Sequence, residues 1–223
     1  MRNRTIKAEK ALAQVERGER LSRLHPLAVA FHEAAHCVFL EAFDIRVGWA
    51  TCVQGVDPED GSFCLGMTSS NAPNVALPPG LHIIHMLAGS IAEHALISKH
   101  PFDPKNFNVS ATDSRGIKNM LRKTWKTNQE AVGHVVRCAE KTHELTQEPE
   151  IARWIKAVAV ELYIAKRLEG DEVRKILRAN GFYDGKNPLV EFAARITELT
   201  AQLARENPMS APSTNTSPNE FGI

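Results

Sequence analysis

Several common classes of protein are excluded by what the 223-residue sequence lacks. Its 27 Lys and Arg residues are balanced by 26 Asp and Glu residues, so no net field favours nucleic acid or an anionic membrane surface. No apolar run reaches the about 18 residues that a membrane span requires. No Gly-x-x-x-x-Gly-Lys-Ser/Thr loop is present, so we do not expect the chain to hydrolyse ATP by itself. We therefore predict neither a nucleic-acid nor a membrane partner.

Cysteine is scarce, and its residues are widely spaced. The four cysteines, Cys37, Cys52, Cys64 and Cys138, include no Cys-x-x-Cys pair, and we interpret them as reduced and mostly buried thiols. The charged N-terminus leads into no apolar signal-peptide core, which indicates a cytoplasmic protein.

Composition divides the chain into three parts. Residues 1–24 are polar and favour an exposed helix, whereas residues 206–223 are rich in Ser, Thr, Pro and Asn, which is typical of a disordered tail. With 43% hydrophobic residues the chain can bury one good core, and we place this core in a single domain at residues 25–205.

Hydrophobic periodicity and the Gly and Pro breakers predict the elements of this domain. An apolar helix at about 26–43 is followed by β-prone segments at 45–53 and 62–69, which predict a small sheet beside the helix. Further helices are expected at about 79–99, 114–125, 128–145, 149–168, 171–180 and 188–205. The predicted fold class is α+β and mainly α-helical, with the first helix and a small β-sheet followed by an all-α helical bundle.

The first apolar helix contains the sequence His32-Glu33-Ala34-Ala35-His36. Residues four apart on a helix lie on the same face, because four steps of about 100° return to within about 40° of the start. His32 and His36 can therefore hold one metal ion, and Glu33 can reach a water molecule on that ion as a general base. The pattern predicts a zinc hydrolase.

The motif has an alternative interpretation as a buried helix with two hydrogen-bonded histidines. A His-Glu-x-x-His string arises by accident in roughly a few of every hundred chains of this composition. Without a metal, each polar group left unpaired in the apolar helix would cost about 1–3 kcal/mol. We therefore favour the metal interpretation.

Other polar residues are less decisive. Asp113 follows Ser110 by three residues, a spacing typical of helix capping, and the helix dipole also stabilises a carboxylate in the first turn. Its alternative role is a third metal ligand, and spacing alone does not decide between the two. His82 and His85, on the second apolar helix, have no partner motif, and we interpret them as ordinary polar positions.

Taken together, these motifs resemble the peptidase domain of FtsH-type ATP-dependent zinc metalloproteases. That family has a His-Glu-Ala-Gly-His helix, a Leu-Gly-x-Thr strand, a Gly-x-x-Ala-Glu helix, an Ala-Ser-Asn-Asp helix start and a closing Leu-x-Gly-x-Glu-Ile segment. The counterparts in this sequence, in the same order, are His32 to His36, Leu65-Gly66-Met67-Thr68, Gly89-Ser90-Ile91-Ala92-Glu93, Ser110-Ala111-Thr112-Asp113 and Leu168-Glu169-Gly170-Asp171-Glu172-Val173.

The resemblance implies a metallopeptidase with Zn²⁺ as cofactor and a peptide or unfolded protein as substrate. Asp113 would be the third zinc ligand, Glu33 would be the general base, and Glu93 would support the site by holding a ligand imidazole. The strand at 65–68 would bind an extended substrate at the edge of the sheet.

The chain also departs from the family pattern. The Gly of the zinc motif is Ala35, which a helix interior tolerates, and the Asn before the ligand Asp is Thr112. The family's ATPase module and membrane anchor have no counterpart here, so we expect substrates that are unstructured, or that a separate ATPase motor delivers. Homo-oligomerisation is left open, because the family's hexamer draws partly on the missing module.

Two other functions stay open at this point. A regulatory protease would cleave one partner and show almost no activity on unfolded proteins in general. A catalytically idle peptidase fold would serve as a binding or adaptor module. The intact His32, Glu33 and His36 disfavour the adaptor, because a pseudoenzyme has no chemical reason to keep all three.

Overall fold

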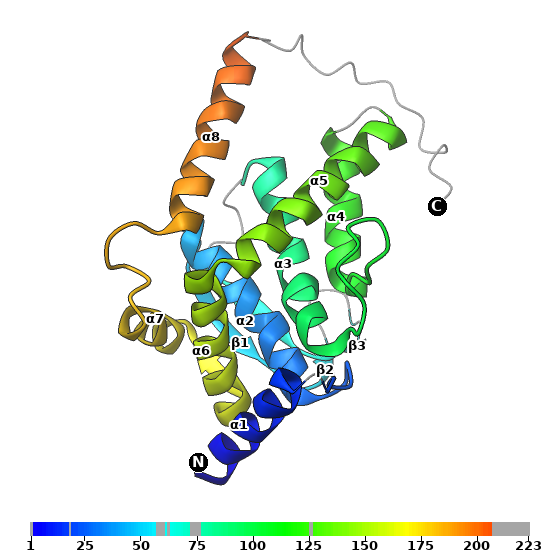
Figure 1. Ribbon diagram of the computed structural model, residues 1–223. Helices are drawn as coiled ribbons and strands as arrows, with labels where there is room; N and C mark the ends of the chain where they lie inside the picture. Colours follow the sequence, from blue (N-terminus) through cyan, green and yellow to red (C-terminus); the bar gives the residue numbers. More distant parts are fainter. Residues whose placement is uncertain are drawn as a thin grey trace.

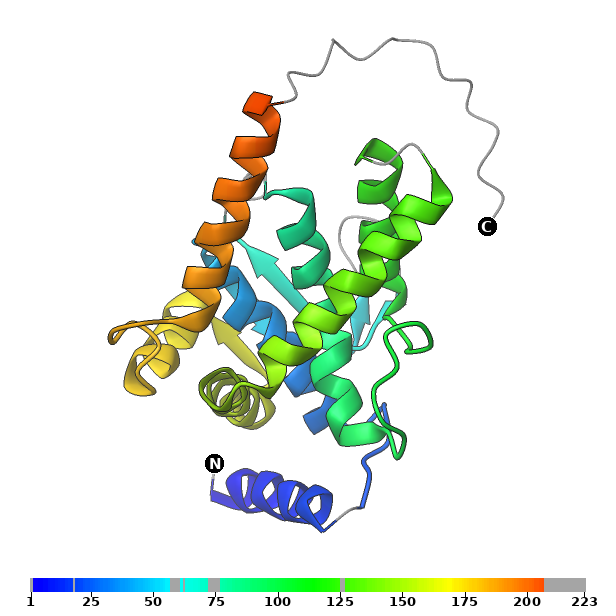
Figure 2. The ribbon, with the colours of Figure 1, turned by 45° about the horizontal axis from the view of Figure 1, so that its top comes forward.

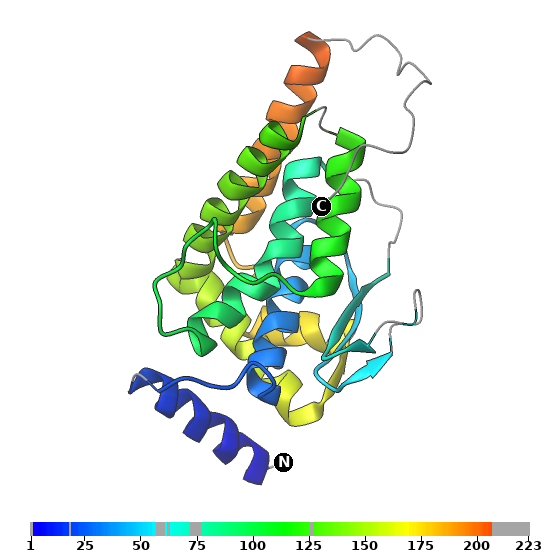
Figure 3. The same ribbon diagram turned by 90° about the vertical axis from the view of Figure 1, so that its right-hand side faces the viewer.

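The computed structural model describes residues 2–17, 19–56, 61, 63–71, 77–124 and 127–206. In chain order its elements are α1 (Arg2–Glu16), α2 (Pro26–Ala42), β1 (Val47–Thr51), β2 (Gly55–Val56), β3 (Phe63–Cys64), β4 (Met67–Ser70), α3 (Pro79–Ile97), α4 (Ala111–Thr124), α5 (Asn128–Gln147), α6 (Pro149–Ala165), β5 (Arg167–Glu169), α7 (Gly170–Ala179) and α8 (Pro188–Glu206). The strands gather along one side of the helices (Figures 1 and 3). The predicted class, a mainly helical α+β fold, is confirmed.

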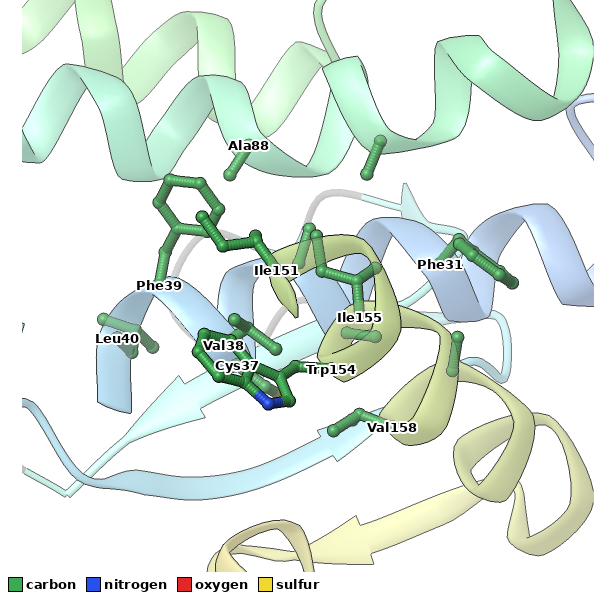
Figure 4. Packing of buried hydrophobic residues seen from close by; sticks show 14 of the residues in the cluster. Phe31, Cys37, Val38, Phe39, Leu40, Ala88, Ile151, Trp154, Ile155 and Val158 are labelled. Atoms are coloured by element: carbon green, nitrogen blue, oxygen red, sulfur yellow. The ribbon is translucent and has the colours of Figure 1, made fainter. Parts of the chain in front are cut away.

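Helix α2 is buried along almost its whole length. Pro26 lies in the first turn, where its missing N–H would have had no intrahelical partner, and the His25 side chain caps this turn by accepting a backbone N–H. Fifteen of the 17 residues of the helix are buried, because α3 and α6 cover it. Figure 4 shows Phe39 of α2 directed toward Ala88 of α3, with Trp154 of α6 beside α2.

A three-stranded antiparallel sheet, in the order β4-β1-β5, packs against α2. Ala50 of the central strand β1 pairs with Thr68 of β4 on one side and with Leu168 of β5 on the other. Strand β4 is therefore at an edge, and its outer side has no strand partner among the described residues. Strands β2 and β3 form a separate two-stranded ladder.

The second half of the chain is not entirely helical, and the expectation of an all-α bundle was wrong at Arg167–Glu169, which form β5. Helix α6 ends at Lys166, whose φ of 74° lies in the left-handed region, and the chain then pairs with β1. Three residues are too few for an alternating pattern to be recognised in a sequence. Strand formation here depends on the partner strand and on the burial of Leu168.

The expectation that no segment is long and apolar enough to cross a membrane was wrong for α3, which meets that criterion by length and composition alone. In the structure 67% of its most apolar stretch is buried, and α3 packs against α2 and α5. Core helices meet the same criterion, and the packing of α3 accounts for its apolar sequence.

The terminal helices lie at the margins of the molecule. Helix α1, which forms within the predicted polar N-terminal segment, packs against α6. Helix α8 projects from the body, as Figure 2 shows. The predicted disordered tail lies outside the described residues except for Glu206, the last residue of α8.

Glu41, near the C-terminal end of α2, holds three later segments against that helix. Its side chain is 5% exposed and accepts hydrogen bonds from the N–H of Val47 at 2.9 Å, from Arg174 of α7 at 3.0 Å and from the Tyr183 hydroxyl at 3.2 Å. Burial and the neighbouring Glu41 charge raise the pKa of Tyr183 to about 12, so the hydroxyl keeps its proton. This network fixes the start of β1 relative to the helix that carries the metal motif.

We predict that Glu41→Ala lowers the free energy of unfolding by about 3 kcal/mol, because the buried N–H of Val47 and the guanidinium of Arg174 lose this acceptor. Urea denaturation followed by tryptophan fluorescence measures the change. The control is Glu144→Ala, which removes an exposed pair with Lys141 and should change the free energy by less than about 0.5 kcal/mol. Equal effects of the two substitutions would contradict the stabilising role of the network.

Candidate metal centre

Three buried side chains from two helices converge at one point. His32 and His36 lie on one face of α2, and Asp113 lies in the first turn of α4. Nε2 of His32 is 3.2 Å from Nε2 of His36 and 3.2 Å from Oδ2 of Asp113, and Nε2 of His36 is 3.5 Å from Oδ1 of Asp113. All three ligand atoms lie within 4.8 Å of one another, so the group could hold a metal ion.

Helix α3 leaves room for this group at Gly89. A Cβ atom at this position would lie 2.6 Å from Nε2 of His32 and 2.6 Å from Nε2 of His36, a separation that real Cβ atoms do not show. The helix interior would otherwise favour Ala over Gly by about 1 kcal/mol. Gly89 is therefore needed at the closest approach of α3 to the two imidazoles.

The outer nitrogen of His32 is held by a carboxylate of α3. Nδ1–H of His32 donates to Oε2 of Glu93 at 2.9 Å, so Nε2 is the nitrogen that would face a metal ion and give up its proton when the ion binds. In the metal-free chain burial lowers the pKa of His32, but the hydrogen bonds to Asp113 and Glu93 outweigh it and raise this pKa to about 10. Glu93 therefore lies against the imidazole of His32.

The outer nitrogen of His36 is held by the backbone instead. Its Nδ1–H donates to the carbonyl oxygen of His85 at 3.0 Å, and the rings of the two residues are 4.9 Å apart. His85 is buried, and its own Nε2 has no hydrogen-bond partner among the described residues. Burial lowers the pKa of His85 well below its usual value, so the ring stays neutral. The interpretation of His85 as an ordinary polar position missed its place beside the ligands.

Asp113 is oriented by the cap of its own helix. The Ser110 hydroxyl accepts the N–H of Asp113 at 3.1 Å and donates to Oδ2 of Asp113 at 2.6 Å, while the N–H of Ser110 bonds to Ser90 of α3 at 3.0 Å. Capping and convergence on the histidines, which were alternatives in the sequence, therefore occur together. Burial raises the pKa of Asp113, but the adjacent His36 and His32 outweigh it and hold this pKa well below its usual range.

Glu33 lies between the group formed by His32, His36 and Asp113 and the edge strand β4. Its Oε2 accepts a hydrogen bond from the Thr68 hydroxyl of β4 at 2.8 Å. A Cβ at Gly66 would lie 2.8 Å from Oε1 of Glu33, so this glycine allows the strand to approach the carboxylate. Burial raises the pKa of Glu33 even though His32 and His36 lower it, which strengthens this group as a base near neutral pH.

The four residues of the predicted substrate strand lie at the start of β4 or just before it. Met67 and Thr68 begin β4, Leu65 and Gly66 immediately precede it, and all four are half-buried. The structure therefore places the edge strand against Glu33, which directly follows His32 of the candidate metal group.

Some supporting residues carried no recognisable signal in the sequence. Arg23 lies 3.0 Å from the second oxygen of Glu93, and Ser90 positions the start of α4. The carbonyl oxygen of His85 is a backbone group that any residue would supply. None of these contacts belongs to a motif, because each depends on how distant segments pack.

Comparison with family models found no match, and comparison with curated proteins found no match either. The assignment of the centre therefore depends on its own chemistry.

We predict that Asp113→Ala weakens binding of Zn²⁺ at least about 100-fold, because loss of a direct ligand should exceed the 10–100-fold effect typical of supporting groups. Competition with a chromophoric chelator measures the affinity. The matched control is Asp103→Ala, an exposed carboxylate in the loop before α4. Retention of zinc by Asp113→Ala at the level of the unmodified chain would exclude Asp113 as a ligand.

We also predict that Gly89→Ala weakens zinc binding at least about tenfold, because the new methyl group would displace one of the two imidazoles. Gly133→Ala on α5 is the control, since its Cβ would meet only the side chain of Arg137, at 3.5 Å. Unchanged zinc affinity in Gly89→Ala would show that the space at Gly89 is not required by the ligands.

Proposed function

We propose that the chain is a zinc-dependent metallopeptidase that hydrolyses peptide bonds of unstructured proteins or peptides, with a peptidase fold similar to that of the FtsH-type proteases. The observation that carries this proposal is the buried carboxylate of Glu33, which lies between the His32, His36 and Asp113 group and β4, the edge strand among the described residues. A base, a metal-ligand set and a strand that can receive a peptide are the three parts that such a reaction needs.

Zinc fits the donor set best. Two imidazole nitrogens and one carboxylate oxygen are the ligands of many catalytic zinc sites, whereas Mg²⁺ and Ca²⁺ prefer oxygen ligands alone. Both imidazoles have a fixed outer partner, Glu93 for His32 and the carbonyl of His85 for His36, which is the support that zinc-binding histidines usually have. Three protein ligands leave a fourth position for water or substrate.

The proposed mechanism assigns the proton transfers to Glu33. When bound, zinc would supply Lewis acidity that activates water and polarises the peptide carbonyl. Glu33 would accept the proton of the attacking water and then donate it to the leaving amine. Its raised pKa suits both steps, and the hydrogen bond from Thr68 holds one carboxylate oxygen while the other remains available.

The edge strand supports an extended substrate. β4 pairs with β1 on its inner side, and no described strand pairs with its outer side, where a peptide would add as a further strand. A folded protein rarely exposes such an extended segment, whereas an unstructured one does so readily. Folded substrates would first have to be unfolded, which is the task of an ATPase motor.

The decisive experiment is hydrolysis of an unfolded test protein such as casein by the full chain. Glu33→Gln should retain zinc and lower the rate at least about 100-fold, since general bases contribute about 10²–10⁴ in rate. Chelation should abolish the activity, and added Zn²⁺ should restore it.

The matched control is Glu144→Gln, which makes the same change at an exposed carboxylate of α5 and should leave the rate unchanged. Full activity of Glu33→Gln would contradict the proposed mechanism. Stoichiometric zinc without any hydrolysis would favour a protease restricted to one partner, or the adaptor function.

A further inference from the structure

We propose that Arg23 is a positioning residue of the metal centre, which acts on His32 through Glu93. One carboxylate joins the two: Oε1 of Glu93 lies 3.0 Å from Nε of Arg23, and Oε2 accepts the Nδ1–H of His32 at 2.9 Å. The inference rests on the metal site of the proposed function and adds a residue that no motif of the sequence indicated.

The Glu93 side chain needs a second partner because it is only 7% exposed. Among the described residues Oε1 accepts no hydrogen bond of good geometry, so the ion pair with Arg23 is the polar contact recorded for this oxygen. A buried carboxylate without a counter-charge is strongly disfavoured. Arg23, at 40% exposure, brings a positive charge to Glu93 from the solvent side.

The position of Arg23 is set by the segment between α1 and α2. The N–H of Leu21 donates to the carbonyl of Leu96 at 3.1 Å, and Nε of Arg20 donates to the carbonyl of Ser98 at 2.5 Å. These bonds fasten the segment across the C-terminal end of α3, one turn beyond Glu93. Arg23 and Glu93 both line a cavity of about 470 Å³.

Loss of Arg23 would affect His32 more than His36. With Arg23 in place, both oxygens of Glu93 are engaged on opposite sides, so rotation of the carboxylate away from His32 would break the ion pair as well as the hydrogen bond. Without Arg23, Oε1 would be drawn toward water in the cavity, and the ring of His32 would lose its fixed orientation. His36 is held by a backbone carbonyl, which this change does not touch.

The test compares Zn²⁺ affinity in the full chain and in Arg23→Met, measured by chelator competition. We expect Arg23→Met to bind Zn²⁺ roughly five- to twentyfold more weakly than the unmodified chain. Loss of a group that bonds a metal ligand directly typically costs 10–100-fold, and Arg23 acts one contact further away, through Glu93. Arg17→Met removes the same charge from an exposed pair with Glu19 and should stay within about twofold of the unmodified chain. Arg23→Lys, which keeps the charge, should recover most of the affinity.

Two further measurements separate positioning from a general structural effect. In the Glu93→Gln background, adding Arg23→Met should cause little further loss, because both changes act on one interaction. The visible spectrum of the Co²⁺-loaded chain should change in Arg23→Met and not in Arg17→Met, since it reports ligand geometry. The melting temperatures of the metal-free variants serve as the folding control.

Unchanged Zn²⁺ affinity and Co²⁺ spectrum in Arg23→Met would overturn the inference, and so would an equal loss with and without Glu93→Gln. Failure of the unmodified chain to bind either Zn²⁺ or Co²⁺ would overturn the metal site itself. Zinc binding that depends on Arg23 without peptide hydrolysis would support this inference and contradict only the proposed function.

Discussion

The candidate centre depends on one physical constraint, which is that α2 buries ionisable groups inside an apolar helix. His32, Glu33 and His36 have almost no access to water, so their side chains depend on hydrogen-bond partners from other segments of the chain. The strand β4 supplies the Thr68 hydroxyl for Glu33, and α3 supplies a carboxylate and a carbonyl for the two imidazoles. The arrangement of the sheet, α3 and α4 around α2 satisfies this requirement.

Helix α3 meets the constraint with a pattern that repeats every four residues. His85 contributes its carbonyl to His36, Gly89 makes room for both imidazoles, and Glu93 binds His32. Positions 85, 89 and 93 lie on one face of a helix, so a single surface of α3 is complementary to the ligand-bearing surface of α2. The contacts that bring α3 close to α2 are therefore the same contacts that orient the imidazoles of His32 and His36.

The sequence predicted the local parts of this centre better than the tertiary ones. The His-Glu-x-x-His motif needs only helical periodicity, and the helices were recognisable from their apolar faces and their Pro or Gly boundaries. Asp113 and Glu93 required a resemblance to known proteases, because they lie 81 and 61 residues along the chain from His32, the residue that both contact. Arg23 and the carbonyl of His85 gave no signal, since an ion pair across segments and a backbone acceptor leave no pattern in one sequence. Strand β5 was missed for the same reason.

The order of the strands has a consequence for how the protein is made. β1 lies between β4 and β5 in the sheet. β4 begins 16 residues after the end of β1, whereas β5 begins more than a hundred residues after the end of β1. During synthesis the ribosome releases β4 early and β5 late, so the sheet beside Glu33 has only one of its two pairings until α6 has emerged. A nascent chain would thus contain His32, Glu33 and His36 well before the three-stranded sheet beside them is complete.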